Sequence, residues 1–110
     1  MTITKEQAQS DLEKIMSRFG TAGSGTEYDR AAQLVLQTIG VLERRLSNKP
    51  AIKMLYLENE EAKKLLPQTV YETAINYLDG RINEQSAREI LEDAHQQYEL
   101  VFKELGISLQ

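Results

Sequence analysis

Residues 83–105 have the sequence NEQSAREILEDAHQQYELVFKEL, in which apolar residues return every three or four positions. This spacing places the apolar side chains on one face of an α-helix. Asn83 precedes the repeat as a helix-capping residue, and Gly106 follows it as a C-terminal stop. The stretch therefore predicts an amphipathic helix whose buried stripe consists of Ala87, Ile90, Leu91, Ala94, Tyr98, Val101, Phe102 and Leu105.

Three further stretches have the same periodicity, at Thr4–Phe19, Glu27–Leu46 and Ala51–Asp79, and no stretch alternates in the manner of a strand. The chain is therefore expected to be all-α, an antiparallel four-helix bundle that forms a single domain over residues 1–110. Proline removes a backbone donor and clashes with the preceding turn, so the third helix is expected to be broken or kinked at Pro67.

The first two helices have recognisable starts. Thr4 with Gln7 three residues later fits a capping box, and Thr26 is placed to cap the second helix. Between these helices, Gly20–Thr26 contains three glycines and indicates a flexible linker. We therefore expect the first helix to be loosely tethered.

The apolar stripe of the second helix is unusually wide, which predicts a central helix that is contacted on two sides. Gly40 lies inside this helix, where it destabilises by about 1 kcal/mol relative to alanine, so a close helix crossing is expected there. The residues expected to be buried are Ala31, Leu34, Val35, Thr38, Val41 and Leu42.

Composition argues against most catalytic and metal chemistry. The chain has no cysteine and one histidine, His95, so neither a thiolate nucleophile nor a complete Glu-x-x-His metal site is available within it. We expect a solvent-facing His95, no metal, no cofactor and no enzymatic activity. The polar N-terminus and the lack of an apolar run of about 20 residues predict a cytoplasmic protein without a membrane span.

Charge is unevenly distributed along the chain. Residues 1–50 hold seven basic and six acidic side chains, residues 51–110 hold six basic and eleven acidic ones, and the net charge is −4. The nearest approach to a basic face is Arg44, Arg45 and Lys49 at one helix end. This balance disfavours nucleic acid and leaves a protein as the expected partner.

Two of the five tyrosines, Tyr56 and Tyr77, fall off the apolar stripes of their segments. Exposed aromatic side chains are favoured at partner surfaces, although half-buried tyrosines with the hydroxyl in water are the alternative. The tail after Gly106 either folds back or stays available. We expect the C-terminal half to carry a recognition face that contains Tyr56, Tyr77, Arg81, Ile107 and Leu109.

The segment LLPQTVYETAINYLDGRIN at 65–83, a helix that ends in a turn before a polar cap and an amphipathic final helix, resembles a known family. So does the helix end LERRL at 42–46. Both are similar to pediocin-like (class IIa) bacteriocin immunity proteins of the enterocin A immunity type. The chain departs from that family in its negative net charge and in its short tail after Gly106.

The resemblance implies binding without catalysis. The protein would associate from the cytoplasmic side with the sugar-transport membrane receptor that a bacteriocin has engaged, and its C-terminal half would carry specificity, as a monomer or weak homodimer. The alternatives are a phage or bacterial regulatory adaptor that acts by protein–protein binding, and a bundle whose only strong contact is with itself.

Overall fold

The computed structural model describes residues 3–19 and 26–107, and within these ranges every regular element is helical, as expected. The long helices are α1 (Lys5–Met16), α2 (Thr26–Arg44), α5 (Gln68–Leu78) and α6 (Glu84–Glu104). The short ones are the 3₁₀ turn η1 (Ser17–Phe19), α3 (Lys49–Ile52), the π-helical turn η2 (Lys53–Leu57) and α4 (Glu60–Lys63).

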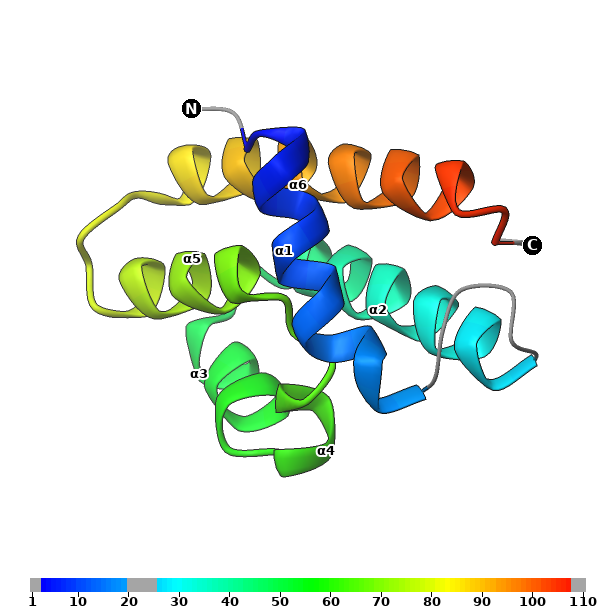
Figure 1. The fold of residues 1–110 in the computed structure, drawn as a ribbon. Helices are drawn as coiled ribbons and strands as arrows, with labels where there is room; N and C mark the ends of the chain where they lie inside the picture. Colours follow the sequence, from blue (N-terminus) through cyan, green and yellow to red (C-terminus); the bar gives the residue numbers. More distant parts are fainter. Residues whose placement is uncertain (1–2, 20–25, 108–110) are drawn as a thin grey trace.

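The long helices do not all run side by side (Figure 1). α2, α5 and α6 follow the long axis of the molecule, with α6 antiparallel to the other two, and α1 crosses them. The short elements α3, η2 and α4 form a lobe at one side, between the end of α2 and the start of α5. The all-α class is confirmed, but the expected antiparallel four-helix bundle is not, since three long helices are aligned and the fourth lies across them.

The centre of the core is α6, which packs against α1, α2 and α5. Its buried face includes Leu91, Tyr98 and Phe102, all fully buried, which confirms most of the stripe predicted from 83–105. The prediction that α2 is the central helix was wrong, because α6 and not α2 joins three long helices. α2 does contact two neighbours, α6 and α1 with η1, in agreement with the predicted contacts on two sides.

The predicted caps are confirmed at two helices. The Thr4 hydroxyl accepts a hydrogen bond from the Gln7 amide at 3.1 Å, and the Asn83 side chain accepts one from Ser86 at 2.8 Å. α2 begins at Thr26 itself, whose side chain lies outside the described residues, as does the remainder of the Gly20–Thr26 linker.

The third helical stretch is broken twice. Pro67 precedes α5 as its N-cap in extended conformation, so the chain separates there rather than kinking. A second break, not foreseen, falls at Asn59, whose side chain accepts hydrogen bonds from the amides of Glu61 and Ala62. Asparagine side chains that accept hydrogen bonds from nearby backbone amides compete with the backbone hydrogen bonds of a helix. The helix therefore ends before Asn59, and a new one, α4, begins after it.

Two expectations for α2 were wrong. Leu34 is 41% exposed, because the inward face is formed by Val35, Ile39 and Leu42. A methyl group added at Gly40 would meet only the Arg44 side chain, at 3.8 Å, so no close helix crossing lies there.

The C-terminal tail folds back as far as it is described. Gly106 adopts a φ of +79°, and the Ile107 amide donates to the Phe102 carbonyl at 3.1 Å, as in a Schellman cap. This reversal buries Ile107 to 5% exposure and leaves Leu105, expected in the stripe, 45% exposed. In the described part of the chain, no helix combines the length and apolarity that a membrane crossing requires.

Candidate functional site

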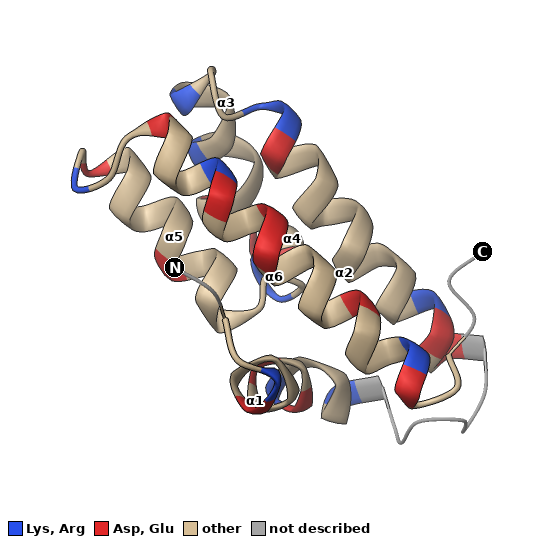
Figure 2. Cartoon of the chain, turned by 90° about the horizontal axis from the view of Figure 1, so that it is seen from above, with Lys and Arg blue, Asp and Glu red and all other residues tan. Residues whose placement is uncertain are grey.

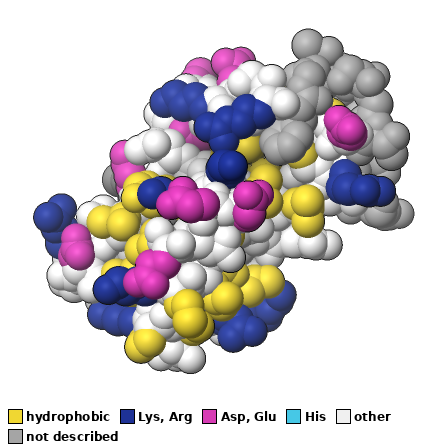
Figure 3. Space-filling model, turned by 90° about the horizontal axis from the view of Figure 1, so that it is seen from below, with side chains coloured by type: hydrophobic (Ala, Val, Ile, Leu, Met, Phe, Trp, Pro, Cys, Tyr) yellow, Lys and Arg dark blue, Asp and Glu magenta, His cyan; other side chains and the backbone are white. Residues whose placement is uncertain are grey.

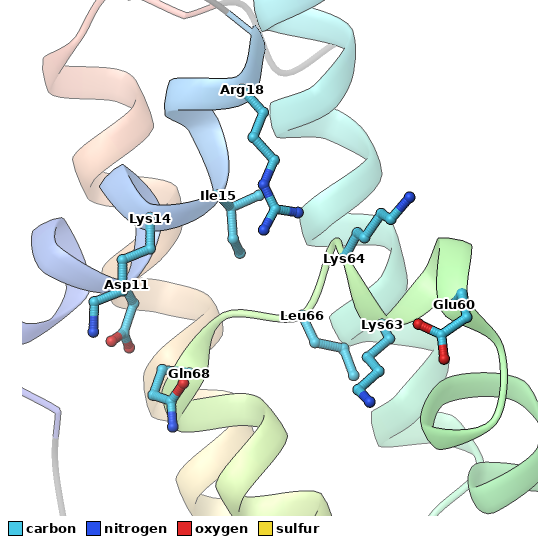
Figure 4. Close-up of a pocket in the computed structure, with 9 residues that line it drawn as sticks. All are labelled: Asp11, Lys14, Ile15, Arg18, Glu60, Lys63, Lys64, Leu66 and Gln68. Atoms are coloured by element: carbon cyan, nitrogen blue, oxygen red, sulfur yellow. The ribbon is translucent and has the colours of Figure 1, made fainter.

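A cleft of about 330 Å³ separates the second half of α1 from α4 and the segment that leads to Pro67 (Figure 4). Basic side chains stand on both walls: Lys14 and Arg18 come from the α1–η1 side, and Lys63 and Lys64 from the α4 side. We refer to it as the cationic cleft. Its lining residues are Asp11, Lys14, Ile15, Arg18, Glu60, Lys63, Lys64, Leu66 and Gln68.

The four cations of the cleft are poorly neutralised by the protein itself. Lys64 lies 3.9 Å from a Glu61 carboxylate oxygen, but both side chains are mostly exposed, and such a pair contributes little. The Lys63 ammonium lies 5.9 Å from the Tyr71 ring centroid. Among the described residues neither Lys14 nor Arg18 has an ion-pair partner. The cleft therefore presents positive charge to whatever enters it.

The α1 wall is held in place by a buried carboxylate, Asp11, which is 1% exposed. One of its oxygens accepts hydrogen bonds from the Tyr98 hydroxyl at 2.8 Å and the Thr69 hydroxyl at 2.7 Å. The other accepts one from the side-chain amide of Gln7 at 2.8 Å. No lysine or arginine pairs with Asp11 within the described ranges. Hydrogen bonds from α1, α5 and α6 replace the water that a carboxylate loses on burial.

Asp11 also caps a helix that has no cap of its own. The first turn of α5 follows Pro67, which offers no side-chain acceptor, and the Thr69 amide instead points at Asp11 at 3.4 Å. A negative charge at a helix N-terminus is favoured by the helix dipole. Burial raises the pKa of the Tyr98 hydroxyl, and its hydrogen bond to Asp11 raises it further, so Tyr98 remains a donor. The network fixes α1 against α5 and α6.

The sequence contains a signal for this network. Asp11 lies three residues after Ala8 and four before Ile15, on the buried face of the first helix. A carboxylate at such a position must find donors from elsewhere in the fold.

The cleft belongs to a wider basic end of the molecule, which we define as residues 44–66 with Lys14 and Arg18. Residues 44–66 hold six basic and three acidic side chains, a balance of +3, and the two α1–η1 residues bring it to +5. The remaining five basic and fourteen acidic residues give −9. Figure 2 shows acidic residues along α6, and on the face seen in Figure 3 Lys and Arg side chains lie among exposed hydrophobic ones.

A second polar cluster lies between α2 and α6. His95 Nδ1 is 3.8 Å from one Glu43 oxygen, while the other Glu43 oxygen is buried without a hydrogen-bond donor. Burial raises the pKa of Glu43 and Glu92 adds to the rise, whereas His95 and Arg88 lower it. The expectation of a solvent-facing His95 was wrong, because its side chain is only 31% exposed and faces Glu43 on the neighbouring helix.

Three of the five residues expected to form a recognition face are buried. Tyr56 and Tyr77 are each 5% exposed, so their expected exposure was wrong, and Ile107 is buried, in agreement with the alternative that the tail folds back. Arg81 is exposed beyond α5, and Leu109 lies outside the described residues.

The two tyrosines are buried because the helical phase changes before each of them, at the π-helical turn η2 for Tyr56 and at the restart after Pro67 for Tyr77. The π-helical turn presents Tyr56 to the core, and α5, beginning after Pro67, presents Tyr77. The Tyr77 hydroxyl donates to the Leu46 carbonyl beyond the end of α2, and the Lys49 ammonium lies 4.7 Å from its ring centroid. Both side chains therefore join the lobe to the core instead of facing a partner.

No group of three or more His, Asp or Glu side chains in the described ranges is placed to hold a metal ion. The arrangement offers charge, shape and exposed apolar surface, which are the properties of a binding face.

No protein-family model matches the chain, and neither a curated protein nor a solved structure matches it.

Proposed function

We propose that this chain is a non-catalytic binding protein whose contact face is the basic end around the cationic cleft. The observation that supports this proposal most is the separation of charge: a chain of net charge −4 keeps four poorly neutralised cations on the two walls of one cleft. Separated charge of this kind steers an oppositely charged partner and fixes its orientation more than it stabilises the fold.

For the biological role we propose a cytosolic bacteriocin immunity protein, on the resemblance of residues 42–46 and 65–83 to that family. In this proposal α1, α2, α5 and α6 correspond to the four helices of the family's antiparallel bundle. The protein associates with the bacteriocin-engaged membrane receptor from the cytoplasmic side and blocks the pore. A phage or bacterial regulatory adaptor is the second candidate, because a charged docking cleft serves that role equally well.

The test is bacteriocin challenge of a sensitive Gram-positive strain that expresses the chain. The minimum inhibitory concentration should rise with the intact protein and return toward that of the empty strain with Lys63→Glu/Lys64→Glu. Lys5→Glu/Lys103→Glu is the matched control, because it changes the net charge equally at two lysines outside the cleft that are 52% and 61% exposed and pair with Glu104 at 2.8 Å and Glu99 at 3.5 Å. No protection by the intact chain against a panel of pediocin-like bacteriocins would refute the immunity role and favour the adaptor.

A further inference from the structure

We propose that the cationic cleft binds an acidic segment of a partner protein, a stretch in which several Asp or Glu carboxylates follow one another along an extended or helical backbone. This inference rests on the proposed function, since it names the chemistry of the partner that the basic end receives. Three observations support it: the cations lie on two walls, the N-terminus of α5 is already occupied by Asp11, and the remaining surface is acidic.

The cations lie on two walls and not at one point. Lys14 and Arg18 are four residues apart on the α1–η1 side, and in Figure 4 the Arg18 side chain extends into the space that faces Lys64 and Leu66. Lys63 and Lys64 stand on the opposite side. In Figure 4 the Arg18 guanidinium points into the space between the walls, whereas the ammonium groups of Lys14 and Lys64 lie at its outer edges. The cations are therefore spread along the cleft and its rims, which suits carboxylates spaced along a peptide.

A compact phosphate requires a different arrangement, with convergent donors that commonly include backbone amides at a helix N-terminus. The N-terminus of α5 lies at the cleft, and its position for an anion is already filled by the Asp11 carboxylate, which accepts from the Thr69 amide and hydroxyl. α4 also begins at the cleft, with Glu60, and there the Asn59 side chain accepts from the amides of Glu61 and Ala62. At both helix starts a side-chain oxygen of the protein already occupies the place that a compact phosphate would take.

The cleft also suits a partner other than a second copy of this chain. A homodimer would have to bring the acidic surface of α6 into the cleft of its neighbour while the two-fold partner does the same. The acidic residues of α6 are distributed along a helix that packs against α1, α2 and α5 (Figure 2), and this helix lies on the opposite side of the molecule from the α4 lobe (Figure 1). We therefore assign the cleft to a segment of another protein.

The contact is weak per group and sensitive to salt. Each exposed ion pair changes affinity by about 1.5- to 5-fold, so removing two of the four cations should weaken binding at least about twofold. Because the charges are exposed, raising the salt concentration should reduce the effect.

The experiment measures fluorescence anisotropy of labelled hexaglutamate with the full chain, at about 20 mM and about 150 mM NaCl. The cleft variant is Lys14→Gln/Lys63→Gln, and the matched control is Lys5→Gln/Lys103→Gln. Both remove two positive charges, so they change the net charge equally, but the control residues pair with Glu104 and Glu99 outside the cleft. Circular dichroism confirms that both variants keep the helical content of the parent.

The expected result is a Kd at least about twofold higher for the cleft variant at low salt, with the control less than about 1.5-fold different from the parent. Equal weakening in the two variants overturns the proposal, because the attraction is then not located in the cleft. Tighter binding of oligouridylate or inorganic phosphate than of hexaglutamate, each used as competitor, also overturns it.

The failure of this inference is distinguishable from the failure of the proposed function. If hexaglutamate does not bind but Lys63→Glu/Lys64→Glu still abolishes bacteriocin protection, the basic end is the contact face and the acidic-segment chemistry is wrong. If hexaglutamate binds in the cleft and the intact chain gives no protection, the inference holds and the immunity role is wrong.

Discussion

Breaking the Asp11–Tyr98 hydrogen bond from either side should destabilise the protein by different amounts, and the difference is predictable. Tyr98→Phe removes one 2.8 Å hydrogen bond to a carboxylate while the other donors to Asp11 remain. A hydrogen bond to a charged group contributes about 1.5–3 kcal/mol, and we expect the lower end because Asp11 stays largely satisfied.

Asp11→Ala should cost more, about 3–4 kcal/mol, because it leaves the Tyr98 hydroxyl, which is fully buried, and the Thr69 hydroxyl without their acceptor. In the double variant Asp11→Ala/Tyr98→Phe no tyrosine hydroxyl is left unsatisfied. Its cost should therefore fall short of the sum of the two single costs by about 1–2 kcal/mol.

The assay is urea unfolding followed by far-ultraviolet circular dichroism. With a slope of about 1–3 kcal/mol per molar urea, the midpoint for Asp11→Ala should fall by about 1 M or more. Tyr71→Phe is the control, because Tyr71 is only half-buried and its substitution should stay within about 0.5 kcal/mol. Strict additivity of the two single variants, or a Tyr98→Phe cost no larger than that of Tyr71→Phe, would refute the role assigned to this network.

Three smaller perturbations test other parts of the structure by the same unfolding assay. Gly40→Ala should stabilise by about 1 kcal/mol, because the added methyl group meets only ordinary contact at 3.8 Å, and destabilisation would reveal a crossing that we do not see. Ile107→Ala should cost about 2 kcal/mol, since Ile107 is 5% exposed, and an unchanged midpoint would place the tail outside the core. Burial raises the pKa of Glu43 in the folded state above its ordinary value of 4.5, so the free energy of unfolding should fall as the pH rises from 4.5 through the folded-state pKa. Glu43→Gln should flatten this fall, and parallel pH profiles of the variant and the parent would contradict the prediction.

The meeting of the two basic pairs at the cationic cleft could not be predicted from the sequence. Lys14 and Arg18 are four residues apart, which puts them on one side of a helix, and Lys63-Lys64 is evident in the sequence. Nothing local says that these two pairs, some fifty positions apart, face one another. That juxtaposition depends on the breaks at Asn59 and Pro67, which turn α4 toward α1.

The two buried tyrosines are a second feature that the local sequence pattern did not predict, since they were expected to be exposed. The apolar stripe of a continuous helix leaves Tyr56 and Tyr77 on the wrong side, and from that pattern their exposure was expected. The π-helical turn at Lys53–Leu57 and the restart of the helix after Pro67 each change the helical phase, and both rings lie inward. An error of one or two residues in where a helix restarts rotates every later side chain by a large fraction of a turn.

The sequence by itself determined the features that are decided within a turn or two of chain: the all-helical class, the caps at Thr4 and Asn83, and the stop at Gly106, which has a positive φ. These depend on propensity, periodicity and capping, which act between residues three or four positions apart. Only the tertiary structure decided that Asp11 is buried, because its donors Thr69 and Tyr98 are 58 and 87 residues away. A carboxylate is normally left in water. The burial of Asp11 is possible because three helices meet around it, and no local pattern in the sequence specifies that meeting.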